Sequence, residues 1–362
     1  METNFGGTKA YTVGVEEEFQ LVDPVTRELS PAIDEILAAG NRLDWVTSEL
    51  SQSCVELVSP IFENVAQLGK DLPTLRRKLG ELARGCGVEL AAAGTHPFSN
   101  PVEQPFTRGE HHLKVEEQMG WVARTQAIYG LHVHVAVPDE EAAIQAMGVL
   151  SRHVPLMIAL SGNSPFWRGS DTRLSSTRIK VFEIFPRSGL PPAFNNWSEF
   201  ESHVETLVAS GNIPDYSWCW WDVRPHPRFG TVELRSPDVQ TNLSSTVSLA
   251  ALVQCLVAAA EGRDPENPLL TEENKWLATR HGLDAVFYDF ADGKKIEARA
   301  LARRLVEELR PVSQELGCES ELEGVLEIVA RGSGAELQRS VFKRRGSLVS
   351  VVEHLVRATS SV

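Results

Sequence analysis

Cysteine is scarce in this chain, with five residues among 362, and no two of them have the Cys-x-x-Cys spacing. An odd, dispersed set argues against a disulfide framework and against a zinc ribbon, and predicts free, mostly buried thiols in a reducing compartment. No basic region followed by an apolar run begins the chain, so no secretory signal is expected. The longest apolar stretch, 247–260, is too short to span a bilayer. These absences predict a cytoplasmic protein without a membrane partner.

Positive charge is also in short supply, because 35 Lys and Arg face 49 Asp and Glu, giving a formal net charge of −14. Nucleic acids and anionic membranes would repel such a chain unless it had a strong local basic patch. The two basic runs, 76–78 and 343–345, are interpreted as solvated helix faces. Neither a Gly-x-x-x-x-Gly-Lys-Ser/Thr loop nor a Gly-x-Gly-x-x-Gly loop occurs, which disfavours ordinary P-loop and Rossmann nucleotide binding.

The length of the chain would allow two domains, but no flexible linker divides it, so we expect one domain over 1–362. Helical periodicity is seen at 65–84 and 139–160, and the part from about 243 onward reads as almost wholly helical. The stretch 164–197, rich in Pro, Gly, Ser and Arg, is expected to be an active-site loop with a short helix inside. Strands are predicted at 12–23, 54–58, 88–94, 128–137, 217–224 and 231–235.

Carboxylates and imidazoles alternate with apolar residues in three of these strands. Side chains two apart in a strand share a face, so Glu16 lies with Glu18, His132 with His134, and Glu233 with Arg235. The intervening residues are mostly apolar and should face a core. Carboxylates crowded on the other face repel one another unless protons or cations neutralise them. This pattern favours a site for hard divalent cations.

Each of these motifs has a plainer interpretation. Glu16 and Glu18 could belong to an exposed edge strand, and Glu56, between Val55 and Leu57, could lie on a solvated strand face. The two histidines suit metal ligation but are also typical of zinc hydrolases and cupin-like iron sites, or of imidazoles satisfied by buried hydrogen bonds. Glu233 and Arg235 could be a surface ion pair.

Two aromatic groups are less specific. Trp218, Trp220 and Trp221 could stack a nucleobase, although strand tryptophans more often belong to a core. The pair His111 and His112 is expected to face solvent.

Taken together, the segments resemble the glutamate–cysteine ligase type 2-like carboxylate–amine ligases, a branch of the glutamine synthetase and glutamate–cysteine ligase superfamily. The resemblance covers most of the chain and depends on eight motifs that occur in order. They are Gly14-Val15-Glu16-Glu17-Glu18-Phe19, Glu56-Leu57-Val58-Ser59-Pro60, Ala93-Gly94-Thr95-His96-Pro97-Phe98, Gly130-Leu131-His132-Val133-His134, Asn163-Ser164-Pro165-Phe166-Trp167, Trp220-Trp221-Asp222-Val223-Arg224-Pro225, Val232-Glu233-Leu234-Arg235, and Glu273-Asn274-Lys275-Trp276 leading to Arg280-His281-Gly282-Leu283-Asp284-Ala285.

The resemblance implies an α+β fold, with a curved, mainly antiparallel sheet forming a funnel and helices packed on its outer face. ATP would enter one end and the amino-acid substrate the other. It also implies two or three Mg²⁺ or Mn²⁺ ions. Glu16, His132 and Glu233 would hold the ion at the nucleotide phosphates. Glu18, Glu56 and Glu49 would hold the ion near the reacting carboxylate, whereas His134 has no assured ligand role.

The implied activity is ATP-dependent joining of a carboxylate, glutamate first, to an amine through an acyl phosphate. The expected catalytic residues are Arg235, facing the γ-phosphate, Glu233, and Arg178, which would clamp the substrate's α-carboxylate. Arg235, Arg224 and Arg280 are the expected nucleotide-binding residues. The expected partners are small-molecule carboxylate and amine substrates, and a homodimer is left open. Two alternatives stay open, a metal-dependent hydrolase and a metal- or nucleotide-binding protein with a degenerate ligase site.

Overall fold

The computed structural model describes residues 1–40, 43–260, 268–289 and 293–361. Its centre is a sheet of seven strands in the order β2-β3-β1-β5-β9-β8, with β4 paired to β1, and every pairing is antiparallel. The predicted α+β class with a mainly antiparallel sheet is confirmed. The strands of this sheet are β1 (Val13–Val22), β2 (Val46–Ser48), β3 (Cys54–Val58), β4 (Glu89–Ala91), β5 (Leu131–Ala136), β8 (Val223–His226) and β9 (Thr231–Leu234).

The register of the sheet collects the polar motifs on one face. Glu16 lies opposite His132, Glu18 opposite Glu56, and Glu233 opposite His134. The residues between them are buried on the other face, because side chains alternate along a strand. The sheet therefore has one apolar face and one face lined by carboxylates and imidazoles.

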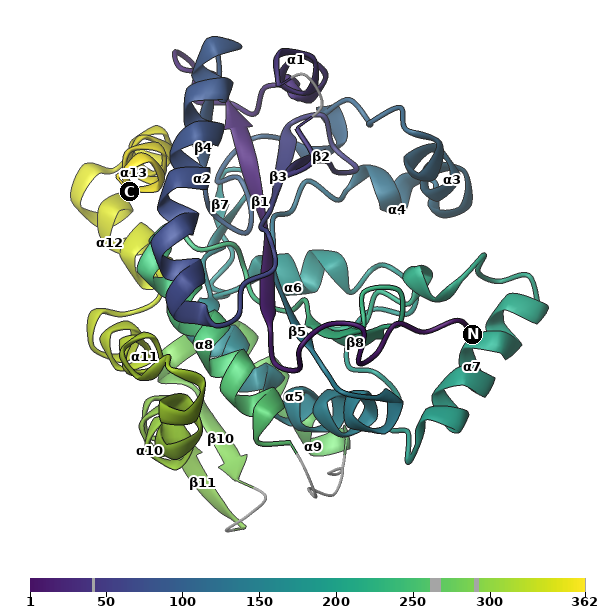
Figure 1. Ribbon diagram of the computed structural model, residues 1–362. Helices are drawn as coiled ribbons and strands as arrows, with labels where there is room; N and C mark the ends of the chain where they lie inside the picture. The colour runs from purple at the N-terminus through teal and green to yellow at the C-terminus, as the bar shows by residue number, and fades with distance from the viewer. Residues whose placement is uncertain (41–42, 261–267, 290–292, 362) are drawn as a thin grey trace.

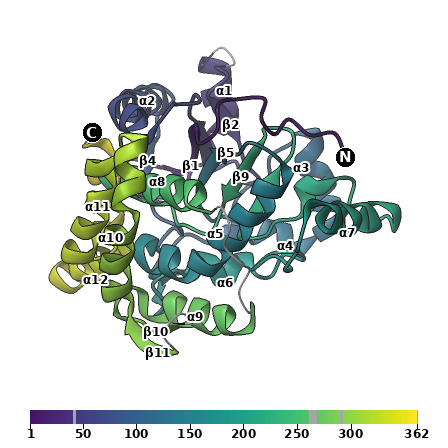
Figure 2. The ribbon, with the colours of Figure 1, turned by 60° about the horizontal axis from the view of Figure 1, so that its bottom comes forward.

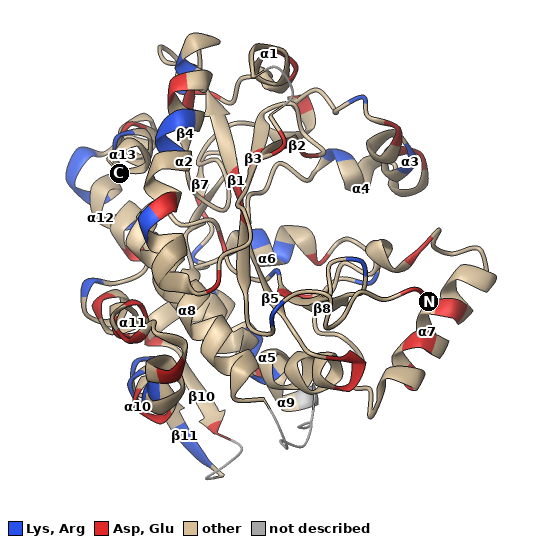
Figure 3. Cartoon of the chain, in the orientation of Figure 1, with Lys and Arg blue, Asp and Glu red and all other residues tan. Residues whose placement is uncertain are grey.

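Three helices cover the apolar face, namely α2 (Val65–Gly85), α5 (Glu140–Ser161) and α8 (Leu243–Ala258). Asn64 caps α2 by accepting from the Gln67 N–H at 3.1 Å, and Asp139 caps α5 by accepting from the Ala142 N–H at 2.8 Å. Helix α8 carries no charged residue and is coloured uniformly in Figure 3. By length and composition α5 could cross a membrane, but 72% of its apolar window is buried inside the protein, as in a core helix.

A buried ion pair joins α2 to the apolar face of the sheet. Glu17, on the face opposite Glu16 and Glu18, is fully buried, and Arg76 of α2 donates to it from Nε at 2.8 Å and from its terminal nitrogen. The Thr246 hydroxyl of α8 also donates to Glu17 at 2.7 Å. The interpretation of run 76–78 as a solvated face is thus wrong for Arg76, which is 3% exposed. An arginine at this point satisfies a carboxylate that the strand's alternation turns into the core.

The C-terminal part is mainly helical but also contains a hairpin, β10 (Val286–Asp289) and β11 (Lys294–Glu297), which corrects the almost wholly helical prediction. Figure 2 shows its later helices together on one side of the molecule. One large buried apolar cluster includes residues of the sheet and of the helices as far as α11, while the single domain over 1–362 stays a prediction. These helices are α9 (Pro268–His281), α10 (Ala298–Leu316), α11 (Glu319–Arg331), α12 (Gly334–Arg345) and α13 (Leu348–Ser360).

Short elements surround the polar face of the sheet. Helices α3 (Glu110–Met119) and α4 (Trp121–Arg124) lie on the side of the sheet away from α2 in Figure 1, and α6 (Thr177–Phe182) is the short helix within 164–197. The predicted strand 217–224 is wrong for most of its length, because Tyr216–Trp218 is a 3-10 turn and β8 begins at Val223. The remaining elements are α1 (Ile33–Ala39), α7 (Trp197–Ala209), β6 (Phe166–Trp167), β7 (Ser170–Asp171) and the 3-10 turns Pro101–Glu103 and Gly282–Asp284.

Candidate active site

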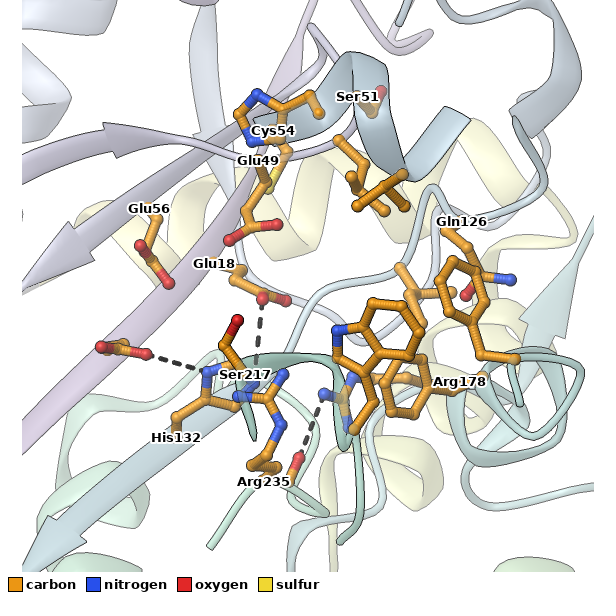
Figure 4. A pocket seen from close by; sticks show the side chains of 18 of the residues that line it. Glu18, Glu49, Ser51, Cys54, Glu56, Gln126, His132, Arg178, Ser217 and Arg235 are labelled. Atoms are coloured by element: carbon orange, nitrogen blue, oxygen red, sulfur yellow. Dashed lines mark hydrogen bonds and ion pairs between the residues drawn. The ribbon is translucent and has the colours of Figure 1, made fainter. Parts of the chain in front are cut away.

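Three carboxylates from neighbouring segments meet on the polar face. Glu18 of β1, Glu56 of β3 and Glu49, just after β2, each offer an oxygen within 4.8 Å of the others. Thr47 donates to Glu56 at 2.6 Å, and the Gly130 N–H donates to Glu18. Among the described residues, no Lys or Arg lies within ion-pair distance of any of the three. Figure 4 shows the three side chains close together at one side of the cavity.

The crowding of these carboxylates raises the pKa values of Glu49 and Glu56. Burial raises the pKa of Glu49 to about 8, and the Glu18 carboxylate adds to the rise. Burial also raises the pKa of Glu56 well above its usual range, and the charges of Glu16 and Glu49 act in the same direction. The cluster therefore lacks positive charge, which a proton or a cation would have to supply.

A second cluster combines carboxylates with both histidines of β5. His132 Nδ1 lies 3.0 Å from Glu16 Oε2, and His134 Nε2 lies 3.4 Å from Glu16 Oε1. Glu233 Oε1 is 3.9 Å from a ring nitrogen of each histidine. Burial alone would raise the pKa of Glu16, but the imidazoles outweigh it, so the pKa falls below its usual range. His134, for which the sequence gave no assured ligand role, forms with Glu16 and Glu233 a set of three donor atoms that lie within 4.8 Å of one another.

Two arginines hold Glu233 in place. Arg224 Nε donates to Glu233 Oε2 at 2.5 Å, and Arg235 donates to Glu233 Oε1. Burial favours the neutral carboxyl, but these two cations keep the pKa of Glu233 well below its usual range. Arg224 also donates to the Ser217 carbonyl at 2.7 Å, whereas the buried Nε of Arg235 has no partner among the residues that the structure describes. Arg235 consequently retains a free donor in the site.

Arg178 reaches the same site from α6. It is 3% exposed and donates to the carbonyls of Ser236 at 3.2 Å and Arg235 at 3.1 Å, while its Nε has no partner in the described part of the chain. Gly130 makes room for it, because a Cβ at that position would collide with the Arg178 guanidinium. The glycine at the start of the Gly130-Leu131-His132 motif therefore leaves the space that the Arg178 guanidinium occupies.

Two cavities meet at Glu16. The substrate-side cavity, of about 270 Å³, is lined by the three carboxylates of the first cluster, by Glu16 and His132 of the second, by three arginines and by an aromatic wall. The apolar cavity, of about 290 Å³, is lined by Val13 and Val15 of β1, by Ile61, and by Phe229 and Arg228 of the β8–β9 hairpin. Glu16 lines both, so ligands in the two cavities would approach each other there.

The structure brings together all the predicted metal ligands and three of the predicted arginines. Arg280 is the exception, since it lines neither cavity and its guanidinium donates to the Arg173 carbonyl. Trp218 and Trp221 are core residues, whereas Trp220 lines the substrate-side cavity.

Some residues of the site were missed by the sequence interpretation. His111 and His112 were expected to face solvent; His111 is exposed and His112 is partly buried, and both line the substrate-side cavity. Gln126, Arg228 and Phe229 were also missed. Their segments carry no strand alternation and no motif spacing, so nothing in the sequence pointed to a site.

The comparisons with known proteins agree with this arrangement. The model of glutamate–cysteine ligase family 2 matches residues 12–354. A Rubrobacter xylanophilus protein named "Putative glutamate--cysteine ligase 2-3" is 59% identical over 363 residues, covering 99% of this chain and 100% of that protein. A second protein of that organism, "Putative glutamate--cysteine ligase 2-1", is 47% identical over 98% of this chain and 96% of its own.

Solved structures show the same fold at low identity. A glutamate–cysteine ligase from Francisella tularensis, in complex with AMP, superposes with a TM-score of 0.72 at 13% identity, covering 98% of this chain and 90% of that one. A bifunctional glutathione synthetase from Pasteurella multocida gives 0.66 at 13% identity, covering 97% of this chain and 52% of its own. The family match and the close relatives show that the chain belongs to glutamate–cysteine ligase family 2, and that it is an ATP-dependent carboxylate–amine ligase of the glutamate–cysteine ligase type.

Proposed function

We propose that the protein transfers the γ-phosphoryl group of ATP to the side-chain carboxylate of glutamate, and that an amine then attacks the acyl phosphate to form an amide. The observation that carries this proposal is the set of carboxylates Glu18, Glu49 and Glu56, which have no Lys or Arg partner among the described residues. They line the substrate-side cavity together with Glu16, which also lines the apolar cavity. Such a set suits a reaction between two anions, whose charge the site must neutralise.

The donor atoms fit hard divalent cations. Glu18, Glu49 and Glu56 offer an all-oxygen set, which favours Mg²⁺. Glu16 with His132 and Glu56, or with His134 and Glu233, adds imidazole nitrogen and would also suit Mn²⁺. Bound cations would neutralise the phosphates and polarise the transferred group.

The apolar cavity is the better place for the nucleotide base. Ile61 and Phe229 offer exposed apolar surface there, and Arg228 lies at the same cavity. The phosphates would then extend past Glu16 toward Arg235, whose free Nε can donate to a phosphate oxygen. Glutamate would occupy the substrate-side cavity, with its α-carboxylate on Arg178.

The protein's own residues mainly bind and orient the reactants. Arg224 and Arg235 fix the Glu233 carboxylate, and the aromatic residues of the substrate-side cavity limit the access of water to the acyl phosphate. No protein nucleophile is required. A cytoplasmic location is part of the proposal, because ATP and free thiols both suit that compartment.

A hydroxamate assay tests the proposal. Hydroxylamine is small enough to reach an acyl phosphate in any amine subsite, so ATP, Mg²⁺, glutamate and hydroxylamine should give ADP and glutamyl hydroxamate in equal amounts. ATP binding without ADP release would favour a degenerate, non-catalytic site. Zinc-dependent turnover without nucleotide would favour the hydrolase alternative.

A further inference from the structure

The substrate-side cavity has two chemically different halves. Its acidic half contains Glu18, Glu49, Glu56 and His132, which lie on one side of Figure 4, and Gln126 lies on the opposite side. The other half is an aromatic wall. Phe182 stacks on Phe185 at 5.9 Å, Phe185 meets the edge of Trp220 at 4.9 Å, and Val115 and Ile128 add aliphatic surface.

The cationic side chains of the cavity are three arginines, and His111 and His112 add two imidazoles to its lining. The arginines that line it are Arg178, Arg224 and Arg235. Arg224 and Arg235 already pair with Glu233, and in the proposed function Arg178 and Arg235 serve the donor's α-carboxylate and the phosphate. Arg187 packs on the Trp220 ring at 5.5 Å and donates to the Trp218 carbonyl, but it does not line the cavity. Among the described residues that line the cavity, a second α-carboxylate would therefore find no arginine left without a role.

Gln126 adds a directed acceptor beside the aromatic wall. It is 7% exposed, and its Nε2 donates to the carbonyls of Val122 and Val181, both at 3.3 Å. Backbone carbonyls can accept only from the amide nitrogen, which fixes the orientation of the side chain. Its Oε1 is buried and has no partner among the described residues, although Gln126 lines the cavity. A buried acceptor of this kind calls for a donor from a ligand.

We propose that the acceptor substrate is a primary amine that has an aromatic or other apolar body and no carboxylate, with a hydrogen-bond donor at its far end for Gln126. Its amino group would point to the acidic half, where the acyl phosphate forms, and its body would pack on Phe182, Phe185 and Trp220. This inference rests on the proposed function and narrows its amine.

Matched pairs of amines test the proposal. Cysteine and cysteamine differ only by the carboxylate, as do phenylalanine and 2-phenylethylamine. With ATP, Mg²⁺ and glutamate, we expect kcat/KM for ADP release to rise at least ~10-fold on loss of the carboxylate in each pair, since a buried unpaired charge is costly. We also expect 2-phenylethylamine to exceed cysteamine. Mass spectrometry of the amide identifies the product.

The role of Gln126 has its own readout. Tyramine adds a phenolic donor to 2-phenylethylamine, and its kcat/KM should be higher by ~5-fold or more in the wild type. Gln126→Met should abolish that ratio, whereas Gln118→Met, at an exposed position of α3 outside the cavity, should keep it. Because both amines are measured on one preparation, loss of folded protein does not alter the ratio.

The outcomes separate this inference from the proposed function. Hydroxamate formation together with a preference for cysteine or phenylalanine over the decarboxylated partner would overturn the inference and leave the ligase function intact. An unchanged tyramine ratio in Gln126→Met would remove the directed acceptor and overturn the inference as stated. Absence of both hydroxamate and ADP would overturn the proposed function and this inference with it.

Discussion

The charged side chains in this site differ in whether the protein supplies partners of opposite charge for them. Glu233 has two arginine partners, whereas Glu49 and Glu56 have no cation and hold their protons tightly. The unsatisfied groups are those to which we assign ligands. Substitutions are therefore most informative where they alter one donor or one acceptor and keep the size of the side chain.

Arg235→Lys is expected to lower ATP-dependent turnover by at least ~10-fold although net charge is kept. The planar guanidinium can donate to Glu233 and to a phosphate oxygen at once, and an ammonium offers only a point charge. Steady-state ADP release measures the effect, with Arg303→Lys at an exposed position as the control. Wild-type turnover in Arg235→Lys would reduce Arg235 to an ion-pair partner of Glu233.

His96 is expected to make the fold sensitive to acid. Its Nε2 lies 2.9 Å from the Arg27 carbonyl, its Nδ1 accepts from the Ser99 N–H at 3.0 Å, and burial lowers its pKa to about 3. The unfolded chain, with a histidine pKa near 6.5, takes up a proton first. Stability is therefore full above pH 6.5 and falls toward pH 3, by about 2 kcal/mol at pH 5.

Urea unfolding at pH 7 and pH 5 measures this loss, which His96→Asn should largely remove because asparagine does not titrate. Equal pH dependence in the variant and the wild type would show that other groups cause the acid sensitivity.

Between elements, α2 packs on the sheet through buried leucines, and one buried ion pair, Arg76 with Glu17, lies inside this apolar layer. Arg76 and Glu17 are both almost fully buried, so either charge alone would be left without a partner. The Glu17 carboxylate of β1 accepts hydrogen bonds from Arg76 of α2 and Thr246 of α8, and these bonds fix the position of α2 relative to β1 and α8.

Arg76→Met should lower the free energy of unfolding by about 3–5 kcal/mol, because Glu17 would remain buried and unpaired. The adjacent Arg77 is about half exposed and pairs with Glu81 on the same helix, so Arg77→Met should change it by about 0.5 kcal/mol or less. Equilibrium denaturation measures both. The double variant Arg76→Met/Glu17→Leu should regain most of the loss, and failure to do so would place the cost in packing.

The elements also show what the sequence could predict. Strand alternation was enough to place Glu16 with Glu18, and the apolar residues between the polar ones indicated that the polar positions of the three strands share the face away from the core, as the register shows. Alternation places Glu17 on the apolar face but does not show which residue pairs with its charge. The partner, Arg76, lies 59 residues away and could not be predicted. Segment 217–224 is rich in tryptophan, but its rings pack around a turn where a strand was expected.

At the scale of the whole molecule, the net charge of −14 is consistent with a protein that binds metal cations. Apart from Glu49, which follows β2, the residues of the two clusters lie on four neighbouring strands, β3, β1, β5 and β9. Cations bound there would therefore link strands that are far apart in sequence. Binding to the folded state alone stabilises it.

Mg²⁺ is therefore expected to raise the melting temperature of the metal-free protein, with about 2.7 kcal/mol of stabilisation at 100 times its Kd. Glu56→Gln should lose most of this increase and lower turnover by at least ~10²-fold, because it removes one charge from the acidic cluster. Glu28→Gln, at an exposed position, is the control. An equal Mg²⁺ effect in Glu56→Gln and the wild type would contradict the assignment of Glu56 as a ligand.

The three consecutive glutamates of β1 restrict how this chain can change its length. Glu16 and Glu18 face the cavities and Glu17 faces Arg76, so a one-residue deletion or insertion that shifts the pairing of β1 would exchange all three environments. Two acidic side chains would then enter the apolar layer, where a single arginine is present to receive them. A shift by two residues would keep the faces. The segment that leads into Val13–Val22 therefore tolerates insertions or deletions only where they shift the strand by an even number of residues.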